Sequence, residues 1–284
     1  MPKVSVIMPV YNTKESDLRT AIESILNQSF KDFEFIIINN ASTTDIKAIV
    51  DCYQDRRIRY FELKENHGGA VARNFGIKNM SGKYYAVMDS DDISLSTRLE
   101  KQVEILDKNP EIVLVASWFK RFPENKIIKA PTYPKLLDFL TCDFLGHSSL
   151  MIRVNKERLE DFLYKEENEV CDDIELYSRL IFKGDFYVIP EVLLDYRCEG
   201  QGISTEKSQK VQEVAKQIKQ KQMDFLTTDK NIQKQIIALL VKNYHIEKSF
   251  WERIFSVKNI AVFHFVYKVI TIFNIEIKIR KGSL

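Results

Sequence analysis

The stretch Tyr84-Tyr85-Ala86-Val87-Met88-Asp89-Ser90-Asp91-Asp92 places three carboxylates directly after a short apolar run. Such a run predicts a buried strand, and in open α/β sheets ligands bind beyond the carboxyl ends of the strands. Carboxylates this close together repel one another unless a cation compensates their charge, and their oxygens suit Mg²⁺ or Mn²⁺. The pattern therefore indicates a site for a metal ion and a diphosphate. The alternative is an acidic cap for the helix expected after Ser94-Leu95-Ser96.

On both sides of this stretch, apolar runs alternate with segments of helical periodicity up to about residue 120. We expect strands at 4–10, 33–38, 58–63, 84–88 and 112–119, separated by helices at 17–27, 45–53, 69–79 and 99–106. This alternation predicts an α/β fold with a mixed, mostly parallel sheet flanked by helices. The rest is less regular, and we expect strands at 148–153 and 186–189 and a helix at 172–182.

The 284 residues, of which 45% are hydrophobic and 29% charged, suit a globular protein with a full core. Charge is distributed unevenly, because residues 206–284 carry 15 Lys and Arg against 7 Asp and Glu, whereas residues 1–205 carry 27 against 33. We therefore expect a main domain over 1–205 and a basic, helical extension over 206–284. Apolar and basic residues mixed over 250–284 favour contact with an anionic membrane surface. Packing on the main domain or a homodimer contact are the alternatives.

The sequence also argues against several classes of protein. Its four cysteines include no Cys-x-x-Cys pair, which fits a reducing cytoplasm and gives no zinc pattern. Met1 leads directly into the first expected strand, and no run of 18 or more apolar residues is free of charge. We therefore expect neither a signal peptide nor a transmembrane helix, and a cytoplasmic protein that is at most peripheral on the inner face of the membrane. No pattern indicates nucleic-acid binding.

Polar and aromatic residues follow the first two expected strands. Tyr11 and Asn12 come directly after Pro9-Val10, and a flat aromatic side chain at this edge can stack on a base, although an ordinary turn has the same pattern. Asn39 follows the second apolar run. Its amide can bond the edge of a base, or it can form an Asx turn into the next helix.

The third expected helix opens with two glycines in Asn66-His67-Gly68-Gly69, and Arg73 lies one turn further on. The amide groups at such a helix N-terminus can bind an anion closely. Arg73 can contact the same anion, or it can hold a carboxylate such as Asp89 or Asp91 in place.

In combination, these motifs resemble the family 2 glycosyltransferases of GT-A fold. The resemblance covers about residues 3–204 and depends on four motifs in order, Ser5-Val6-Ile7-Met8-Pro9-Val10-Tyr11-Asn12, Ser24-Ile25-Leu26-Asn27-Gln28-Ser29-Phe30, Asn66-His67-Gly68-Gly69-Ala70-Val71-Ala72-Arg73-Asn74-Phe75-Gly76-Ile77 and Met88-Asp89-Ser90-Asp91-Asp92. It implies a Rossmann-like nucleotide-diphospho-sugar transferase that acts with inversion. The acceptor would be a saccharide or lipid-linked saccharide of a bacterial surface polysaccharide.

The resemblance also implies roles on the donor side of the site. The residues that match positions at the nucleotide base, ribose and diphosphate are Pro9, Val10, Tyr11, Asn12, Asn39, Asn66, Gly69, Arg73, Asp89, Ser90 and Asp91. Asp91 and Asp92 match the element that would hold Mn²⁺ or Mg²⁺. Glu199 stands where many relatives have a metal-reaching His, so it would be either a further ligand or an exposed loop residue.

On the acceptor side, Cys171-Asp172-Asp173-Ile174 resembles a Glu-Asp motif whose second acid is the catalytic base, which implies Asp173 for that role. Asp172 replaces the usual Glu. His147 begins a segment that resembles the strand facing the acceptor pocket. It would contact the acceptor or the diphosphate, or serve a structural purpose.

Asn39-Asn40 departs from the Asp-Asp that this family usually has. A neutral amide weakens the bond to uracil, because charge-assisted hydrogen bonds are the stronger ones, but Asn still accepts the base N–H. We therefore expect uridine to remain the preferred base. The same change is compatible with a catalytically silent nucleotide-sugar-binding protein. A nucleotidyltransferase is a further alternative, although Tyr11-Asn12-Thr13-Lys14-Glu15 lacks the glycine-rich loop of such enzymes.

Overall fold

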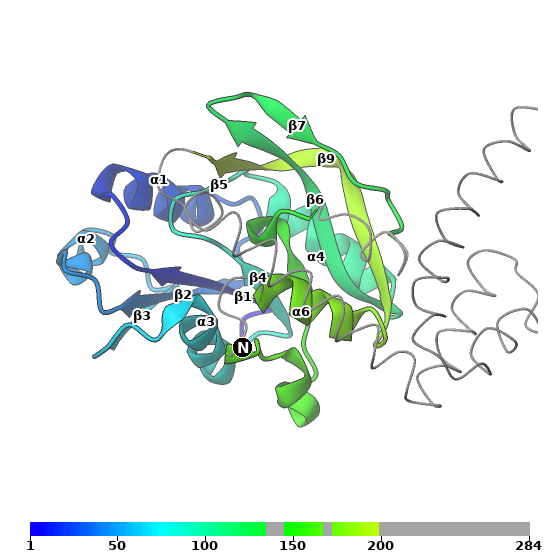
Figure 1. Cartoon of the computed structure of the whole chain (residues 1–284), viewed down its shortest axis with the longest axis horizontal. Helices are drawn as coiled ribbons and strands as arrows, with labels where there is room; N and C mark the ends of the chain where they lie inside the picture. The colour runs from blue at the N-terminus through cyan, green and yellow to red at the C-terminus, as the bar shows by residue number, and fades with distance from the viewer. Residues whose placement is uncertain (135–144, 167–171, 199–284) are drawn as a thin grey trace, which may run out of the picture. The chain divides into compact units, whose positions relative to one another are not determined.

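The computed structural model describes residues 1–134, 145–166 and 172–198 of the chain. Its strands form one nine-stranded sheet in the order β3-β2-β1-β4-β8-β6-β9-β5, with β7 paired to β6 (Figure 1). Glu199, the predicted boundary at 205 and the basic extension lie outside the described residues. None of the described helices has the length and apolar character needed to cross a membrane.

One half of the sheet is parallel and consists of β1 (Val4–Val10), β2 (Phe33–Asn40), β3 (Ile58–Leu63) and β4 (Tyr84–Val87). The continuous apolar runs of β1, β2 and β4 suit strands that are covered on both faces. The register places Val10 beside Asn39, and Asn39 beside Glu62. The residues that follow these strands therefore share one edge of the sheet.

The other half is mixed. Its strands are β5 (Ile93–Ser94), β6 (Ile112–Phe122), β7 (Lys126–Ile128), β8 (Met151–Arg153) and β9 (Asp185–Arg197). Strand β8 runs antiparallel to both β4 and β6, and β9 runs parallel to β6. The expected mixed, mostly parallel sheet flanked by helices is confirmed.

Two expected strands differ from the structure. The segment 148–153 begins as a 3₁₀ helix, η1 (His147–Ser149), and only its second half pairs in the sheet. Strand β9 continues eight residues past Ile189, to Arg197, through Pro190. The register on β6 shifts between Ser117 and Trp118, so Pro190 lies at a bulge where a proline does not break the ladder.

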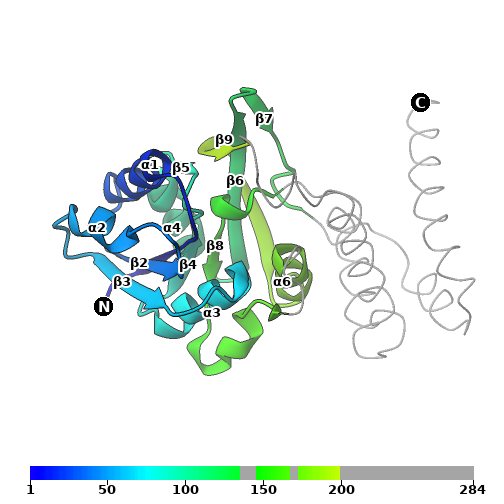
Figure 2. The same cartoon turned by 60° about the vertical axis from the view of Figure 1, so that its left-hand side comes forward.

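Helices cover both faces of the parallel half. Helices α1 (Glu15–Leu26), α2 (Ile46–Asp51) and α4 (Arg98–Lys108) share one apolar core with side chains of β1 and β2. Helix α3 (Gly68–Asn79) packs on the opposite face, where the absence of a side chain on Gly76 allows close approach to Ile7 and Ile38. Figures 1 and 2 show α1 and α3 on opposite sides of β1 and β2.

Helix α6 (Asp172–Leu180) lies beside the mixed half of the sheet, and its buried residues include Leu176, Tyr177 and Leu180 (Figures 1 and 2). Its first turn carries three acids, Asp172, Asp173 and Glu175, which suit the positive end of a helix dipole. A second 3₁₀ segment, η2 (Lys156–Phe162), precedes it in the chain.

Candidate functional site

The loops after β1 and β2 are tied together at the carboxyl edge of the sheet. The Asn12 N–H donates to Ser42 Oγ at 3.0 Å, and Asn12 Oδ1 accepts from the Thr43 N–H at 2.8 Å. Tyr11 is 50% exposed on this edge, whereas Val10 is fully buried and Pro9 half-buried. Tyr11 and Asn12 are therefore the exposed residues at this edge, whereas the side chain of Val10 is inaccessible.

Asn39 is buried at the end of β2 and forms the Asx turn that was one of its two predicted roles. Its Oδ1 accepts from the Ser42 N–H at 2.9 Å, and its Nδ2 donates to Glu62 Oε1 at 3.4 Å. An amide oxygen has two lone pairs, and the Ser42 N–H uses one of those of Oδ1. An aspartate here would instead bring a second carboxylate beside Glu62.

Asn40, which the sequence analysis assigned no role, fixes the loop that leads into α3. Its Nδ2 donates to Asn66 Oδ1 at 2.8 Å and to the Gly68 carbonyl at 3.2 Å. Gly68 has a φ of 86°, a left-handed conformation that favours glycine. The following Gly69 leaves room for an arginine, because a Cβ there would lie 2.9 Å from Arg73 Nη1.

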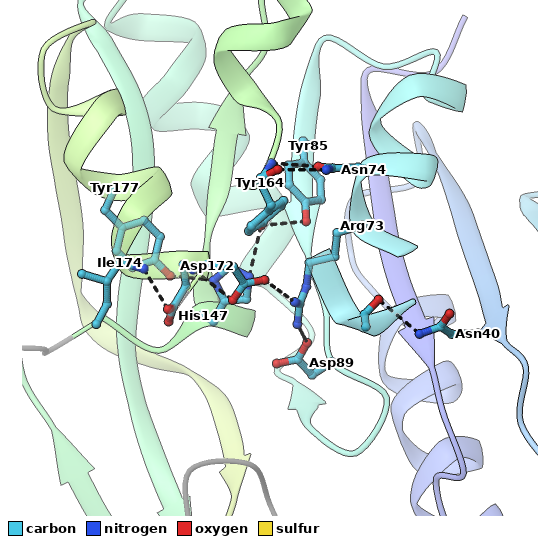
Figure 3. Close-up of polar contacts among 12 residues, drawn as sticks. Asn40, Arg73, Asn74, Tyr85, Asp89, His147, Tyr164, Asp172, Ile174 and Tyr177 are labelled. Carbon is cyan, nitrogen blue, oxygen red and sulfur yellow. Dashed lines mark hydrogen bonds and ion pairs between the residues drawn. The ribbon is translucent and has the colours of Figure 1, made fainter. Parts of the chain in front are cut away.

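Arg73 joins two carboxylates that belong to distant segments (Figure 3). Its Nη2 donates to Asp89 Oδ1 at 2.8 Å, and its Nη1 donates to Asp172 Oδ2 at 3.2 Å. The guanidinium is largely buried, with 13% of the side chain exposed. Of the two roles considered for Arg73, the carboxylate contact is the one observed, and it sets the acids of α6 beside the loop after β4.

The charges of this cluster shift the pKa values of its members. Burial opposes the charge on Arg73, but Asp89 and Asp172 outweigh it and hold the pKa of the guanidinium well above its usual value. Burial also disfavours the Asp89 carboxylate, yet Arg73 keeps its pKa below the ordinary value. For Asp172, burial exceeds the effect of Arg73 and raises its pKa. Asp89 is therefore the charged partner, whereas Asp172 gains a proton more readily.

Burial and mutual repulsion disfavour the charged forms of Asp91 and Asp92 in the loop from Asp89 to Asp92. Burial and Asp89 raise the pKa of Asp91 to about 6, and burial with the two other acids raises the pKa of Asp92 well above its normal value. Helix α4 begins only at Arg98, after β5, so these acids are not its cap. Ser90 is held by a 2.5 Å hydrogen bond between its hydroxyl and that of Thr13.

A divalent cation at this loop stays a prediction, and the chemistry of its acids is compatible with one. A cation at Asp91 would favour the charged form that burial and Asp89 now oppose. Asp92 is 1% exposed; its Oδ1 accepts from the Arg197 N–H at 2.8 Å, and its Oδ2 has no hydrogen-bond partner among the described residues. Within residues 1–134, 145–166 and 172–198, no three His, Cys, Asp or Glu side chains gather as a metal cluster.

Two buried polar residues of α4 bind the end of β4 and η1, which adjoin this loop. Arg98 is fully buried, and its Nη1 donates to the carbonyls of Val87 and Ser148. One turn later, Gln102 Nε2 donates to the Ser149 carbonyl at 2.6 Å. The sequence signal for them was present, because they lie four residues apart on the face of α4 that carries Leu99, Val103 and Leu106.

Asp173 lies half-buried in the first turn of α6, directly after the Asp172 that Arg73 binds. The Ile174 N–H donates to Asp173 Oδ1 at 2.8 Å, and the Asp173 N–H donates to Asp172 Oδ1 at 3.0 Å. The predicted base is thereby placed one residue from the cluster that holds Asp89.

His147 has tyrosine hydroxyls at both ring nitrogens. Nδ1 lies 2.6 Å from Tyr177 Oη, and Nε2 lies 3.1 Å from Tyr164 Oη. Burial, with a smaller effect of Arg73, lowers the pKa of the imidazole to about 3. The predicted alternatives for His147 were a ligand contact and a structural role, and the observed hydrogen bonds are of the second kind.

The end of β9 lies beside the loop from Asp89 to Asp92, which we call the acidic loop. Arg197 Nε donates to the Asp91 carbonyl at 3.0 Å, and its guanidinium lies 3.3 Å from Asp17. The segment that precedes the predicted ligand Glu199 is therefore beside Asp91 and Asp92. No sequence signal indicated the contact with Asp17.

Comparison with known proteins identifies the family to which the sequence is similar. A model described as Glycosyl transferase family 2 matches residues 5–184. A glycosyltransferase of Methanocaldococcus jannaschii is 35% identical over 69% of this chain and 71% of its own. The Bacillus subtilis protein TuaG, named for teichuronic acid biosynthesis, is 30% identical over 72% of this chain and 83% of its own. A Rickettsia bellii glycosyltransferase is 44% identical, but the match covers 45% of this chain and 18% of that protein.

Among solved structures, residues 1–349 of TarS from S. aureus in complex with UDP-GlcNAc superpose with a TM-score of 0.65. The match covers 87% of this chain and 74% of that one at 18% identity, so it is a likeness of fold. The same fragment of TarS has also been crystallised with UDP.

Proposed function

The chain belongs to glycosyl transferase family 2 and has the GT-A fold, and from this we propose that it moves a sugar from a UDP-sugar to a saccharide or lipid-linked saccharide. The observation that carries the proposal is the Arg73 bridge, which sets Asp172-Asp173 beside the Asp89 loop. A donor at that loop would have a potential base within reach. The UDP complexes of TarS and the teichuronic acid role in the name of TuaG support a uridine donor and a surface polysaccharide product.

The donor base would lie at the edge formed by the ends of β1 and β2. Tyr11 is the exposed aromatic residue there and would stack on the base. Asn39 Oδ1 would accept the uracil N–H with the lone pair that Ser42 leaves unused. Asn12 would line the base, while the glycine turn held by Asn66 would lie at the diphosphate.

The sugar would be transferred in one displacement. The acceptor oxygen attacks the anomeric carbon as the bond from that carbon to the diphosphate oxygen breaks, and the diphosphate leaves with the electron pair. Asp173 takes the proton of the acceptor hydroxyl. Attack from the side opposite to the leaving group inverts the configuration, and no covalent enzyme intermediate is needed. The Arg73 bridge would keep Asp173 in place during this step.

Asp91 would hold Mn²⁺ or Mg²⁺ together with diphosphate oxygens, with Asp92 and Glu199 as further candidate ligands. Such an ion, when bound, neutralises charge on a leaving diphosphate. The raised pKa of Asp91 supports this assignment, because burial and, after it, Asp89 oppose the charged carboxylate, and a cation would favour it.

Release of UDP from UDP-glucose, UDP-galactose and UDP-N-acetylglucosamine, with and without Mn²⁺, tests the proposal. We expect release from at least one donor, with water or an added saccharide as the acceptor. Asp173→Asn should lower that release by roughly 10²–10⁴-fold and leave UDP binding unchanged. Glu104→Gln, on the exposed side of α4, is the control and should keep the parent rate.

Two results would contradict the proposal. UDP binding without any turnover would favour the silent nucleotide-sugar-binding protein. Incorporation of a nucleotide into a sugar phosphate, with release of pyrophosphate, would favour a nucleotidyltransferase. Normal release by Asp173→Asn would reassign only the base, with Asp172 or Glu175 as the next candidates.

A further inference from the structure

Four aromatic side chains form a hydrogen-bonded row beside Arg73, which we call the His147 row. Its members are Tyr85, Tyr164, His147 and Tyr177, in that order, as Figure 3 shows. The Tyr85 and Tyr164 hydroxyls are 3.1 Å apart, Tyr164 Oη is 3.1 Å from His147 Nε2, and His147 Nδ1 is 2.6 Å from Tyr177 Oη. The row therefore connects β4, the segment after η2, η1 and α6.

Packing holds the row in one arrangement. The His147 ring meets Tyr164 edge to face, with centroids 5.6 Å apart, and lies 6.0 Å from the Tyr177 ring. The Arg73 guanidinium sits 5.6 Å from the centroid of Tyr164. Asn74, the next residue of α3, receives the Tyr164 N–H at 2.8 Å and donates back to the Tyr164 carbonyl at 2.9 Å. The row is thus fixed to the helix that carries Arg73.

The imidazole of His147 determines which groups donate and which accept in the hydrogen bonds of the row. A neutral ring has one N–H donor and one acceptor nitrogen. One of the two tyrosine hydroxyls beside it therefore accepts a hydrogen bond from the ring, and the other donates one to it. An imidazolium would donate at both nitrogens and would lie close to the Arg73 charge. Burial and Arg73 keep the pKa of His147 far below neutrality, so the neutral form persists across the working range.

We infer that His147 is a positioning residue, which acts through Tyr177 to hold the first turn of α6 against Arg73 and Asp89. Tyr177 follows Asp173 by four residues, so both lie on the same side of α6. The ion pair from Arg73 to Asp172 restrains α6 in its first turn, and the hydrogen bond between His147 and Tyr177 restrains it one turn later. The inference rests on the proposed function, because the restraint affects the reaction only if Asp173 is the base.

Two substitutions of tyrosine by phenylalanine separate positioning from general stability. Tyr177→Phe removes the hydroxyl that contacts His147. Tyr84→Phe is the matched control, because Tyr84 is equally buried on β4 and its hydroxyl donates to Asp107 at 2.7 Å, in a contact that involves no residue of the site. The readouts are UDP affinity by calorimetry, and kcat and KM for release of UDP from the donor that the parent protein uses.

We expect Tyr177→Phe and His147→Phe to lower kcat by roughly 10–100-fold, the cost of a small misplacement of a reacting group. Donor KM and UDP affinity should stay within about twofold, because no donor contact is lost. His147→Gln keeps a donor and an acceptor and should restore part of the rate. Tyr84→Phe should keep the parent kcat.

Equal losses of kcat in Tyr177→Phe and Tyr84→Phe would overturn the inference, since a general loss of packing would explain both. A weaker UDP affinity in His147→Phe with unchanged kcat would also overturn it and would make His147 a donor contact. If His147→Phe does not fold, the comparison of Tyr177→Phe with Tyr84→Phe still decides. Absence of UDP release by the parent protein would instead refute the proposed function, and the inference with it.

Discussion

Arg73 and Asp172 form a 3.2 Å ion pair although 99 residues separate them in the chain. The other arm of the guanidinium binds Asp89, so a single cation compensates the buried Asp172 and the half-buried Asp89. Burial raises the pKa of Asp172, whereas Arg73, at the shorter contact, helps to hold the pKa of Asp89 below its ordinary value.

Removal of Arg73 should destabilise the protein strongly. Arg73→Met leaves the buried Asp172 and the half-buried Asp89 without a counter-charge, and breaking a buried ion pair in this way costs about 3–5 kcal/mol. Urea denaturation at pH 7 measures the change. Arg19→Met is the control, since its pair with Glu15 is largely exposed and such pairs contribute little. Similar effects of the two substitutions would show that the bridge does not stabilise the fold.

Asp91 should be required for metal-dependent donor binding. Burial and Asp89 raise the pKa of its carboxyl to about 6, and a bound cation would favour the charged form that they oppose. Asp91→Asn should therefore weaken UDP binding in Mn²⁺ and have little effect in the presence of a chelator. Calorimetry with both proteins in both buffers measures this. Equal affinity of the parent protein with and without Mn²⁺ would contradict the prediction.

Uridine should be the preferred base, and Glu62 should limit how much a negative charge at residue 39 can help. Thermal shifts with UDP, GDP, CDP and ADP test the first part, and stronger stabilisation by GDP would refute it.

Asn39→Asp alone should gain little affinity for UDP, because its carboxylate would lie beside Glu62. Asn39→Asp combined with Glu62→Gln should bind UDP more tightly than Asn39→Asp.

The neutral imidazole of His147 should make folding sensitive to acid. Its pKa is about 3 in the folded protein and near 6.5 when unfolded, so below pH 6.5 the unfolded chain binds a proton that the folded one does not. Stability is therefore full above pH 6.5 and is lost as pH falls toward 3. At pH 5 the loss from this residue is about 2 kcal/mol.

His147→Gln cannot titrate and should lose less stability than the parent protein between pH 7 and pH 5. Urea denaturation at the two pH values gives the comparison, and carboxylates shared by both proteins cancel in it. An equal loss in the two proteins would mean that His147 takes up a proton in the folded state.

The parallel half of the sheet was readable from the sequence because its strands are short, mostly apolar segments that alternate with segments of helical periodicity. The ranges 4–10 and 58–63 coincide with β1 and β3. The second half of β9 was missed because Pro190 is typical of a strand end, and the bulge opposite it depends on β6. The 3₁₀ turn at His147–Ser149 was missed because Arg98 and Gln102, which bind its carbonyls, belong to another helix.

For the candidate site, the sequence indicated residue types at strand ends but not their partners. Asp89, Asp91 and Asp92 were identifiable because carboxylates rarely follow a buried strand so closely. The contacts of Arg73 with Asp172 and of His147 with Tyr177 join residues that are 99 and 30 positions apart, and no local pattern encodes them. The catalytic, donor and metal roles of these residues stay predictions.

Short strand β5 gives the acidic loop a fixed length. The loop leaves the sheet at the end of β4 and re-enters it two residues after Asp91, where Ile93 and Ser94 pair with Asp195 and Leu194 of β9. One inserted residue would slip that pairing and exchange the faces of the two β5 side chains. Variation in donor choice among relatives of this chain should therefore arise by substitution within the loop, whereas insertions and deletions should gather elsewhere.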